Sequence, residues 1–269
     1  MKVISIMIIH LILYYSLFCV EFDQIEDCTA EVMELDGDAQ CGRFGSVLPI
    51  DDNNVIKKIQ YKMESDLNLI LNEIDILNVI KTSEHGAITA ELSAYCKSPD
   101  STINAGFIYL TLEKCCHDFF GEVQRLRNSS GPSFDSDLMK KLHELVSLLE
   151  TLHSLGIYHL DLHFGNIMAA NEKLKLIDFG MSLLNQNLKP GTTANYYMKR
   201  DLFTLQESFE IVYNYMGIQD SSTIEFLGNI INEIKAQRVN HEDMEITAAG
   251  VKNKFEVFLE TNSANKIML

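Results

Sequence analysis

The sequence predicts an α+β fold, with a strand-rich first part followed by a helix-rich second part. Three observations support this prediction. Short apolar runs separated by turn residues fill the chain up to about residue 112, a single amphipathic helix interrupts them at 64–81, and a long leucine-patterned helix follows at 135–155. The 269 residues are 46% hydrophobic and 22% charged, which is enough apolar material for a globular core in each part.

In the first part, we expect five strands and one helix. The strands are expected at 31–36, from Val47 onward, at 54–59, at 87–95 and at 103–112. Alternation along 54–59 places Lys57 on the inward face between apolar neighbours, whereas Lys58 lies on the opposite face and can be solvated. The helix has apolar residues spaced by three and four, at Leu67, Ile70, Leu71, Ile74, Leu77 and Ile80.

The second part begins with the clearest helix of the chain. Its apolar stripe consists of Leu138, Leu142, Leu145, Leu149 and Leu152. Asp135 or Ser136 can cap its start, and Gly156 can end it. His143 and His153 belong to this helix and have no ligand partner at useful spacing. Two or three more helices are expected near the C-terminal end, roughly at 223–237 and 241–261.

Between these helices, two short apolar runs form a predicted hairpin. Residues 167–168 and 174–177 read as strands that are joined by a turn at 171–173. This hairpin places Asn166 just before its first strand and Asp178 just after its second, so both side chains lie at the same end. An amide and a carboxylate suit Mg²⁺, which shares its remaining ligands with water and phosphate. Asp161, on the preceding loop, is free to accept a proton.

The stretch His159-Leu-Asp-Leu-His-Phe-Gly-Asn-Ile-Met168, followed by Asp178-Phe-Gly180, resembles the catalytic loop and Asp-Phe-Gly motif of the protein kinase superfamily. The resemblance implies a two-lobed protein-kinase-like fold, with a β-rich N-lobe that carries the C-helix and a reduced helical C-lobe. The expected lobes are residues 21–112 and 113–269. It also implies that Asp161 is the catalytic base and that Asn166 and Asp178 bind Mg²⁺.

The first part resembles the N-lobe of the same superfamily. Gly42, Phe44, Gly45 and Val47 match its glycine-rich loop, with Gln40 at the position of the first glycine. The resemblance implies that Lys57 binds the phosphates of ATP, that Glu73 is the partner of Lys57, and that the backbone at Glu113 and Cys115 forms the hinge that binds adenine. It also implies that Asp201, at the start of a buried helix, ties down the catalytic loop.

Two departures leave the acceptor and the regulation open. Leu160 stands where most protein kinases carry an arginine that meets a phosphorylated activation loop, so switching by loop phosphorylation is not expected. His163 and Gly165 give a pattern similar to haspin-type kinases and to aminoglycoside and choline phosphotransferases. The glycine-rich loop and the context of Lys57 favour a protein kinase, so we expect a protein substrate with serine or threonine hydroxyls as acceptors. The alternatives are a small-molecule or glycan kinase and a non-catalytic pseudokinase binding module.

The N-terminal residues 1–20 have the plan of a secretory signal peptide, with one positive charge and then an apolar run. An uncleaved membrane anchor and an apolar helix of a cytosolic chain are the alternatives. Asn128-Ser-Ser130 is a glycosylation sequon that we expect on a surface loop. Together these features predict a glycoprotein that is secreted or resides in the lumen of the secretory pathway.

The net charge limits the partners that we expect, and the cysteines limit the expected disulfides and metal sites. A net charge of −16 argues against binding nucleic acid or an anionic membrane surface, so membrane attachment is expected only through an uncleaved anchor. Of the six cysteines, Cys28 and Cys41 can pair across the N-terminal hairpin, and buried free thiols are expected for most of the others. The cysteine spacing does not indicate a metal site.

Overall fold

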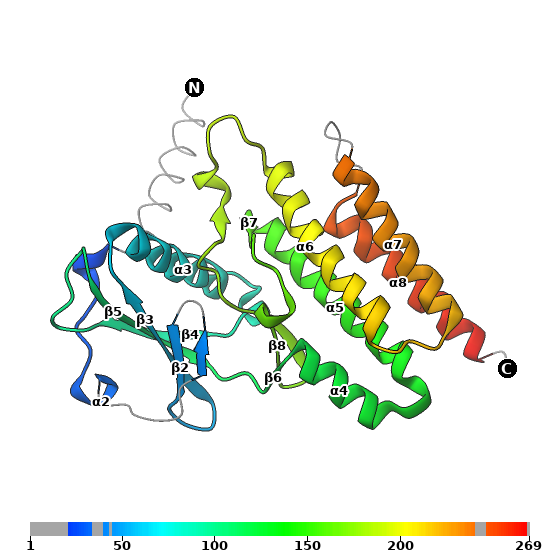
Figure 1. The fold of residues 1–269 in the computed structure, drawn as a ribbon, viewed down its shortest axis with the longest axis horizontal. Coiled ribbons are helices and arrows are strands. Elements are labelled where there is room, and N and C mark those ends of the chain that lie inside the picture. Colours follow the sequence, from blue (N-terminus) through cyan, green and yellow to red (C-terminus); the bar gives the residue numbers. More distant parts are fainter. Residues whose placement is uncertain (1–20, 34–39, 43–44, 240–245, 268–269) are drawn as a thin grey trace. The chain divides into compact units, whose positions relative to one another are not determined.

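The computed structural model describes residues 21–33, 40–42, 45–239 and 246–267. The chain divides into two compact units, residues 1–114 and 115–269 (Figure 1). The first unit holds a sheet and one long helix, and the second unit is mostly helical. The predicted α+β organisation is therefore confirmed. The division falls two residues beyond the expected lobe boundary.

The sheet of the first unit has five antiparallel strands in the order β1-β2-β3-β5-β4. Their bounds are β1 (Gln40–Gly42), β2 (Gly45–Pro49), β3 (Asn54–Tyr61), β4 (Leu92–Lys97) and β5 (Gly106–Glu113). Two strands start later than predicted. Residues 86–88 form a single 3₁₀ turn (η2, Gly86–Ile88), and Thr102 and Ala105 bridge to each other in a tight turn before β5.

One face of this sheet lies against α3 (Glu64–Thr82) (Figure 1). The helix has the predicted bounds to within one residue, because its apolar stripe is what the sheet buries. Its buried residues are Leu67, Ile70, Glu73, Ile74, Ile76, Leu77 and Ile80. Glu73 is the exception among them, since it is a charged residue within an apolar face.

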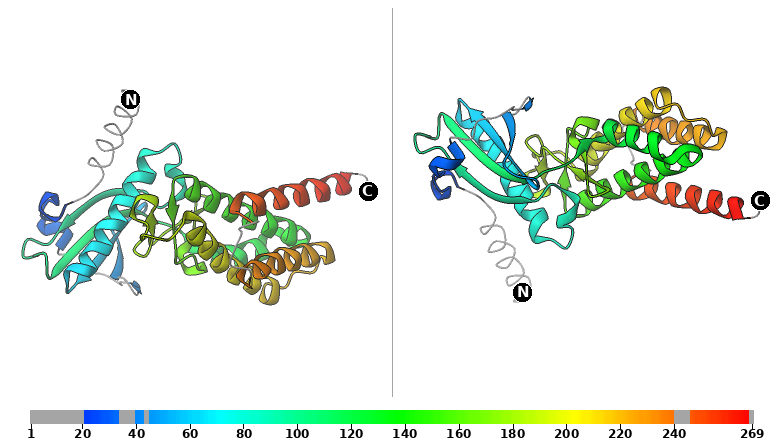
Figure 2. Two further views of the ribbon diagram at one scale, coloured as in Figure 1. Left: turned by 90° about the horizontal axis from the view of Figure 1, so that it is seen from above. Right: turned by 90° about the horizontal axis from the view of Figure 1, so that it is seen from below.

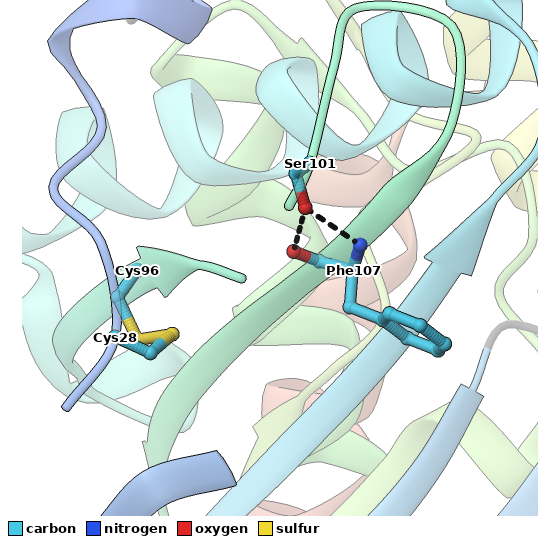
Figure 3. Close-up of a disulfide and its surroundings, with 4 residues drawn as sticks. All are labelled: Cys28, Cys96, Ser101 and Phe107. Carbon is cyan, nitrogen blue, oxygen red and sulfur yellow. Dashed lines mark hydrogen bonds between the residues drawn. A yellow bond between two sulfur atoms is a disulfide. The ribbon is translucent and has the colours of Figure 1, made fainter. Parts of the chain in front are cut away.

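Near β4 the sheet carries the N-terminal segment, which contains η1 (Phe22–Gln24) and α2 (Ala30–Met33). Asp27 bridges to Lys97 in parallel register, and this brings Cys28 and Cys96 to a Cα–Cα distance of 5.0 Å in a disulfide (Figure 3). The prediction that Cys28 pairs with Cys41 is therefore wrong. Around the disulfide, Cys28, Ile56 and Tyr109 are buried, and Val32, Cys96 and Phe107 pack against them.

The first predicted strand, 31–36, is also wrong over its described part, because residues 31–33 belong to α2. Residues 34–36 lie outside the described residues. Val32 of α2 packs into the cluster around the disulfide, so its apolar character serves a helical turn rather than a strand. Lys58 is only half-buried, as expected for the outer face, and its ammonium lies 4.8 Å from the centre of the Phe107 ring.

The second unit is built around α5 (Phe134–Ser154), whose leucine stripe is buried as predicted. The other helices are α4 (Phe119–Ser130), α6 (Ala194–Tyr215), α7 (Ser221–Val239) and α8 (Ala248–Ile267), with single 3₁₀ turns η3 (Gly131–Ser133), η4 (Phe164–Asn166) and η5 (Asn185–Asn187). α8 packs along α5, and α7 packs along α6 (Figure 2). The helix predicted at 223–237 is confirmed as α7. The helix predicted at 241–261 is confirmed only from Ala248 onward, because residues 246–247 are not helical and residues 241–245 lie outside the described part.

The short strands of this unit position its loops. β6 (His117–Asp118), β8 (Ile167–Ala170) and β9 (Lys173–Leu176) form one sheet in the order β6-β8-β9, and β7 (Ile157–Tyr158) pairs with β10 (Leu183–Leu184). The predicted hairpin is thus confirmed as β8–β9. Its turn consists of Asn171 and Glu172, which have φ angles of 50° and 64°. This is the primed turn that suits a two-residue hairpin.

Two sequence expectations about the surface of the second unit need correction. Asn128 is exposed, but it lies in the last turn of α4 and not on a loop. Cys115 is half-buried and Cys116 is exposed, so neither is a fully buried thiol.

Within the described ranges, which begin at residue 21, no helix is both long enough and apolar enough to cross a bilayer.

Candidate active site

In the first unit, Lys57 and Glu73 form the contact that the sequence predicts. Lys57 Nζ lies 2.7 Å from Glu73 Oε1 and 3.0 Å from Oε2, and both residues are buried. β3 and α3 bring them together because both side chains lie between the sheet and the helix. A buried ion pair is expensive unless its geometry is good, and here the ammonium is shared between both carboxylate oxygens. Lys57 is thereby held at a fixed place beside β2.

The glycine-rich turn is described only at its two ends. Gly42 of β1 is paired with Gly45 of β2, and Val47 of β2 lies opposite Lys57 of β3. Phe44, which the resemblance assigns to this loop, lies outside the described residues.

The connector to the second unit begins at the end of β5. The N–H of Glu113 donates to the Glu91 carbonyl (2.9 Å), and the N–H of Lys114 donates to the Asn53 carbonyl (2.7 Å). These two N–H groups are thus used inside the first unit. Cys115, the other predicted hinge residue, is the first residue of the second unit.

In the second unit, the catalytic loop is fastened by Asp201, as the resemblance implies. This fully buried carboxylate accepts hydrogen bonds from the N–H of His159 (2.9 Å) and the N–H of Leu160 (2.7 Å). His153 Nε2 lies 3.0 Å from the same carboxylate. This partner of His153 could not be predicted from the sequence, because 48 residues separate the two and helical spacing does not indicate the contact.

Leu160 adopts a φ of 64°, in the left-handed region that costs a residue with a side chain about 1–2 kcal/mol. The hydrogen bond from its N–H to Asp201 helps to hold this conformation. The residue after it, Asp161, has a half-buried side chain. The unusual backbone therefore lies immediately before the predicted base, where strain is often found in functional loops.

Asp161 and Asn166 are in direct contact. Asn166 Nδ2 donates to the Asp161 carbonyl oxygen at 2.9 Å, with the Asp161 carboxylate at 3.5 Å from the same nitrogen. Because Nδ2 is used in this way, the acceptor oxygen of the amide faces away from the Asp161 carbonyl. Asn166 is buried, so this orientation is fixed by its surroundings.

His163 shapes the same loop. Its Nδ1 accepts a hydrogen bond from the N–H of Gly165 (3.0 Å) at the start of η4, and its Nε2 lies 3.8 Å from Asp161 Oδ2. The neutral ring therefore carries its proton on Nε2, on the side of Asp161. A Cβ at position 165 would lie 3.0–3.1 Å from this ring, so glycine gives the histidine room to fold back.

Asp178 follows β9, with a φ of 63°. The N–H of Ile177 donates to the Asn166 carbonyl at 3.0 Å, so the hairpin ladder continues up to these two residues. Phe179 is fully buried, with its ring centre 5.0 Å from that of His159. Burial lowers the pKa of His159, against the opposing effect of Asp201, and its Nε2 lies 3.1 Å from the Ile177 carbonyl. His159 thus packs the loop, as predicted, and is held neutral.

The donors at the end of the hairpin fit Mg²⁺. Asn166 offers an amide oxygen and Asp178 a carboxylate, and oxygen donors of this kind are what the ion prefers. Among the described residues there is no group of three or more His, Cys, Asp or Glu side chains that could enclose a metal by themselves. Two protein ligands agree with an ion that takes its other ligands from water and phosphate.

Comparison with known proteins identifies the family. Residues 41–216 match the model of the protein kinase domain, which is more than half of the chain. The chain is 30% identical, over 199 residues, to probable serine/threonine-protein kinase 2 of Plasmodium falciparum; the match covers 67% of this chain and 35% of that protein. It is 35% identical over 81 residues to serine/threonine-protein kinase PLK4 of Xenopus laevis, covering 29% of this chain and 8% of that protein.

The chain therefore belongs to the protein kinase family. The two-lobed kinase fold implied by the motifs is confirmed, since a strand-rich unit with one long helix precedes a mostly helical unit. The match with the P. falciparum kinase spans about a third of that protein's length.

Proposed function

We propose that this chain is an ATP- and Mg²⁺-dependent protein kinase that transfers the γ-phosphoryl group to serine or threonine hydroxyls of a protein substrate. The family membership and the serine/threonine kinases among its relatives support this proposal. Phosphoryl transfer needs mainly positioning and charge neutralisation, and the two units hold the residue types that these tasks require.

The buried ion pair of Lys57 and Glu73 carries the proposal. Burying a lysine and a glutamate together in an apolar layer usually brings little stability, so a protein that needed only a stable fold could use apolar residues there. In kinases, this pair must be formed for the lysine to hold the phosphates of ATP. A module that only binds a partner through its surface has no need of it.

Each residue has a definite task in this scheme. Lys57 binds the α- and β-phosphates, and Glu73 keeps its ammonium in place. Asn166 and Asp178 would hold Mg²⁺, which neutralises phosphate charge when bound. Asp161 orients the acceptor hydroxyl and takes its proton. Asp201 keeps the backbone before Asp161 in its left-handed conformation, so that the base stays at one position.

Two substitutions test these roles. Asp161→Ala is expected to abolish transfer but to leave the affinity for Mg²⁺-ATP nearly unchanged, because the base contacts the acceptor. Asp178→Ala is expected to weaken Mg²⁺-ATP binding itself. Transfer is measured with labelled ATP and affinity by calorimetry. Equal nucleotide affinities in the two variants would contradict the assigned roles.

The same labelled-ATP experiment separates the alternatives. His163 folded over Gly165 favours a second candidate, a kinase of small molecules or glycans, because this pattern is similar to aminoglycoside and choline phosphotransferases. Label on protein supports our proposal, and label only on small acceptors supports the second candidate. No transfer and no nucleotide binding by the folded chain would support a pseudokinase.

We also propose that the chain enters the secretory pathway and carries a glycan on Asn128. The apolar segment 1–20 motivates this, and the Cys28–Cys96 disulfide supports it, because structural disulfides persist in oxidising compartments. The side chain of Asn128 is exposed on α4, so it is accessible for attachment of a glycan. Peptide mapping of material from an expressing cell tests this proposal. An intact Met1 on a reduced cytosolic chain would contradict it.

A further inference from the structure

We propose that Lys141 and Glu144 of α5 are positioning residues that hold the turn of the β8–β9 hairpin and thereby fix Asn166 and Asp178 at its other end. This inference rests on the proposed function for its catalytic consequence. Neither residue was singled out by the sequence, where both read as ordinary polar residues between the leucines of α5.

The hairpin turn is one that its own sequence does not favour. Asn171 and Glu172 both have positive φ angles, which asparagine tolerates and which glycine adopts freely. Glutamate is not among the residues that adopt positive φ readily, so Glu172 makes this turn dependent on support from outside the hairpin. Lys141 supplies it, because its ammonium donates to the Glu172 carbonyl oxygen.

Glu144 holds the second residue pair from the turn, which is Ala169 and Leu174. Its Oε1 accepts a hydrogen bond from the N–H of Leu174 at 2.8 Å, and its Oε2 lies 2.9 Å from Lys141 Nζ. The two side chains are three residues apart on α5, so they lie on one face of the helix and act as a single clamp. Lys141 is largely buried, with an exposed side-chain fraction of 12%.

The clamp is joined to a buried carboxylate on α4. Glu122 has an exposed side-chain fraction of 1%, and its Oε1 lies 3.6 Å from Lys141 Nζ. The other carboxylate oxygen lies 2.9 Å from His117 Nε2, on β6, and 2.7 Å from Arg125 Nε. β6 is an edge strand of the β6-β8-β9 sheet. One network of side chains therefore contacts this sheet at two places: at β6 through His117 and at the hairpin turn through Lys141.

The hairpin transmits this restraint to the candidate metal ligands. Four residue pairs connect the turn with Ile167 and Leu176, and the Ile177 N–H continues the ladder to the Asn166 carbonyl. A short antiparallel ladder is stiff when both of its ends are held, and loosening one end loosens the other. Residues that orient metal ligands indirectly typically contribute 10–100-fold to metal affinity or activity.

The test uses Lys141→Met and Glu144→Ala in the full chain, with Lys140→Met as the matched control. Lys140 lies beside Lys141 on α5 but pairs with Asp137 and not with the hairpin. Two measurements are made: hydrogen exchange of the amides of Leu174 and Ile177, and the Mg²⁺ concentration for half-maximal nucleotide binding. We expect at least tenfold faster exchange and about a tenfold higher Mg²⁺ requirement in both clamp variants, with no change in the control.

A rescue separates this role from a general loss of stability. Glycine adopts the left-handed conformation without strain, so Glu172→Gly should let the turn form by itself. We expect Lys141→Met combined with Glu172→Gly to recover most of the exchange protection and Mg²⁺ affinity. If Lys141→Met does not fold, Glu144→Gln is compared with Glu144→Ala, because the amide oxygen can still accept from Leu174 and should retain most of the effect.

The outcomes distinguish this inference from the proposed function. Exchange and Mg²⁺ requirement that stay unchanged in folded clamp variants would overturn the inference, as would equal effects in Lys140→Met. If the wild-type chain binds no Mg²⁺-nucleotide, the proposed function fails, but the exchange of Leu174 and Ile177 still decides whether Lys141 and Glu144 hold the hairpin.

Discussion

At the residue scale, Asp201 of α6 is the side chain that holds the backbone of the catalytic loop. It accepts from two adjacent backbone N–H groups and contacts His153, all without access to water. Asp201→Asn replaces one acceptor oxygen by a donor, which must then face a donor. Leaving a buried N–H without an acceptor costs about 1–3 kcal/mol, so we expect a loss of this size in the free energy of unfolding.

Urea unfolding of the second unit measures this loss. Asp137→Asn is a suitable control, because Asp137 accepts from Lys140 and Ser133 on the surface of α5. Its effect should stay within about 0.5 kcal/mol. Similar stabilities for Asp201→Asn and the wild type would mean that the loop is held by other contacts.

Glu122 gives a prediction about pH. Its burial alone would raise the pKa of its carboxyl, but the hydrogen bonds from Arg125 and His117 and the nearby charge of Lys141 outweigh this and lower the pKa to about 2 from 4.5. A carboxyl whose pKa is lower in the folded than in the unfolded state stabilises the fold at pH values above its unfolded-state pKa. That contribution, on the order of 3 kcal/mol, is fully present above pH 4.5 and is lost between pH 4.5 and pH 2.

Urea unfolding at a series of pH values tests this. The wild type should lose stability more steeply below pH 4.5 than Glu122→Gln, which has no carboxyl to protonate there. Parallel curves for the two proteins would contradict the assigned cause.

Residues of the site differ in how far the sequence could predict them. Lys57 and Glu73 follow from strand alternation and a helical stripe together with the family motif, so their contact was predicted and is present. The clamp of Lys141 and Glu144 could not be predicted, because its partners are backbone groups about 30 residues away. A backbone group is present whatever the residue type, so a hydrogen bond to it cannot be recognised from the residue types of the sequence.

At the element scale, two threonines in the segment before α6 make hydrogen bonds to the backbone. Thr192 Oγ1 donates to the Lys189 carbonyl at 2.6 Å, and Thr193 caps α6 by accepting from the Tyr196 N–H at 3.4 Å. Both hydroxyls thus have structural roles in the polar turn that follows Pro190 and Gly191. We therefore expect transfer activity that does not wait for phosphorylation here.

The expected effects of the two threonines follow from these bonds. Thr193→Ala removes the cap and should lower the free energy of unfolding by about 1 kcal/mol, whereas Thr193→Asp should retain it. Thr192→Ala with Thr193→Ala should keep most of the turnover, measured with labelled ATP. A hundredfold loss in this folded double variant, recovered with aspartates at both positions, would show that the segment is a switch.

Elements with a strong period were predicted well. α3, α5 and the β8–β9 hairpin lie where apolar spacing or turn residues indicated them. The strand expected from residue 31 was wrong over its described part, because a short apolar run such as Val32-Met33 is equally compatible with a helical turn. Tertiary contacts decided the outcome there: Val32 packs beside the disulfide, and no local signal announces that packing.

At the scale of the whole molecule, the first unit depends on one cross-link that the family motifs do not contain. The Cys28–Cys96 disulfide joins the N-terminal segment to β4 across 68 residues (Figure 3). Further contacts follow the same path: the Lys97 N–H donates to the Glu26 carbonyl, and the Lys97 ammonium lies 4.4 Å from the centre of the Phe22 ring. The segment outside the kinase match is therefore part of the folded unit.

Closing a loop of this length is expected to stabilise the fold by about 4 kcal/mol, mainly by restricting the unfolded chain. Cys28→Ser combined with Cys96→Ser should lower the stability of the first unit by a few kcal/mol, and dithiothreitol should have the same effect on the wild type but none on the double variant. Cys116→Ser, which removes an exposed free thiol, is the control and should change little. Unfolding followed by near-ultraviolet circular dichroism and by hydrogen exchange assigns the change to one unit. If the reduced and oxidised chains were equally stable, the cross-link would be incidental, and the support that it lends to an oxidising compartment would be lost with it.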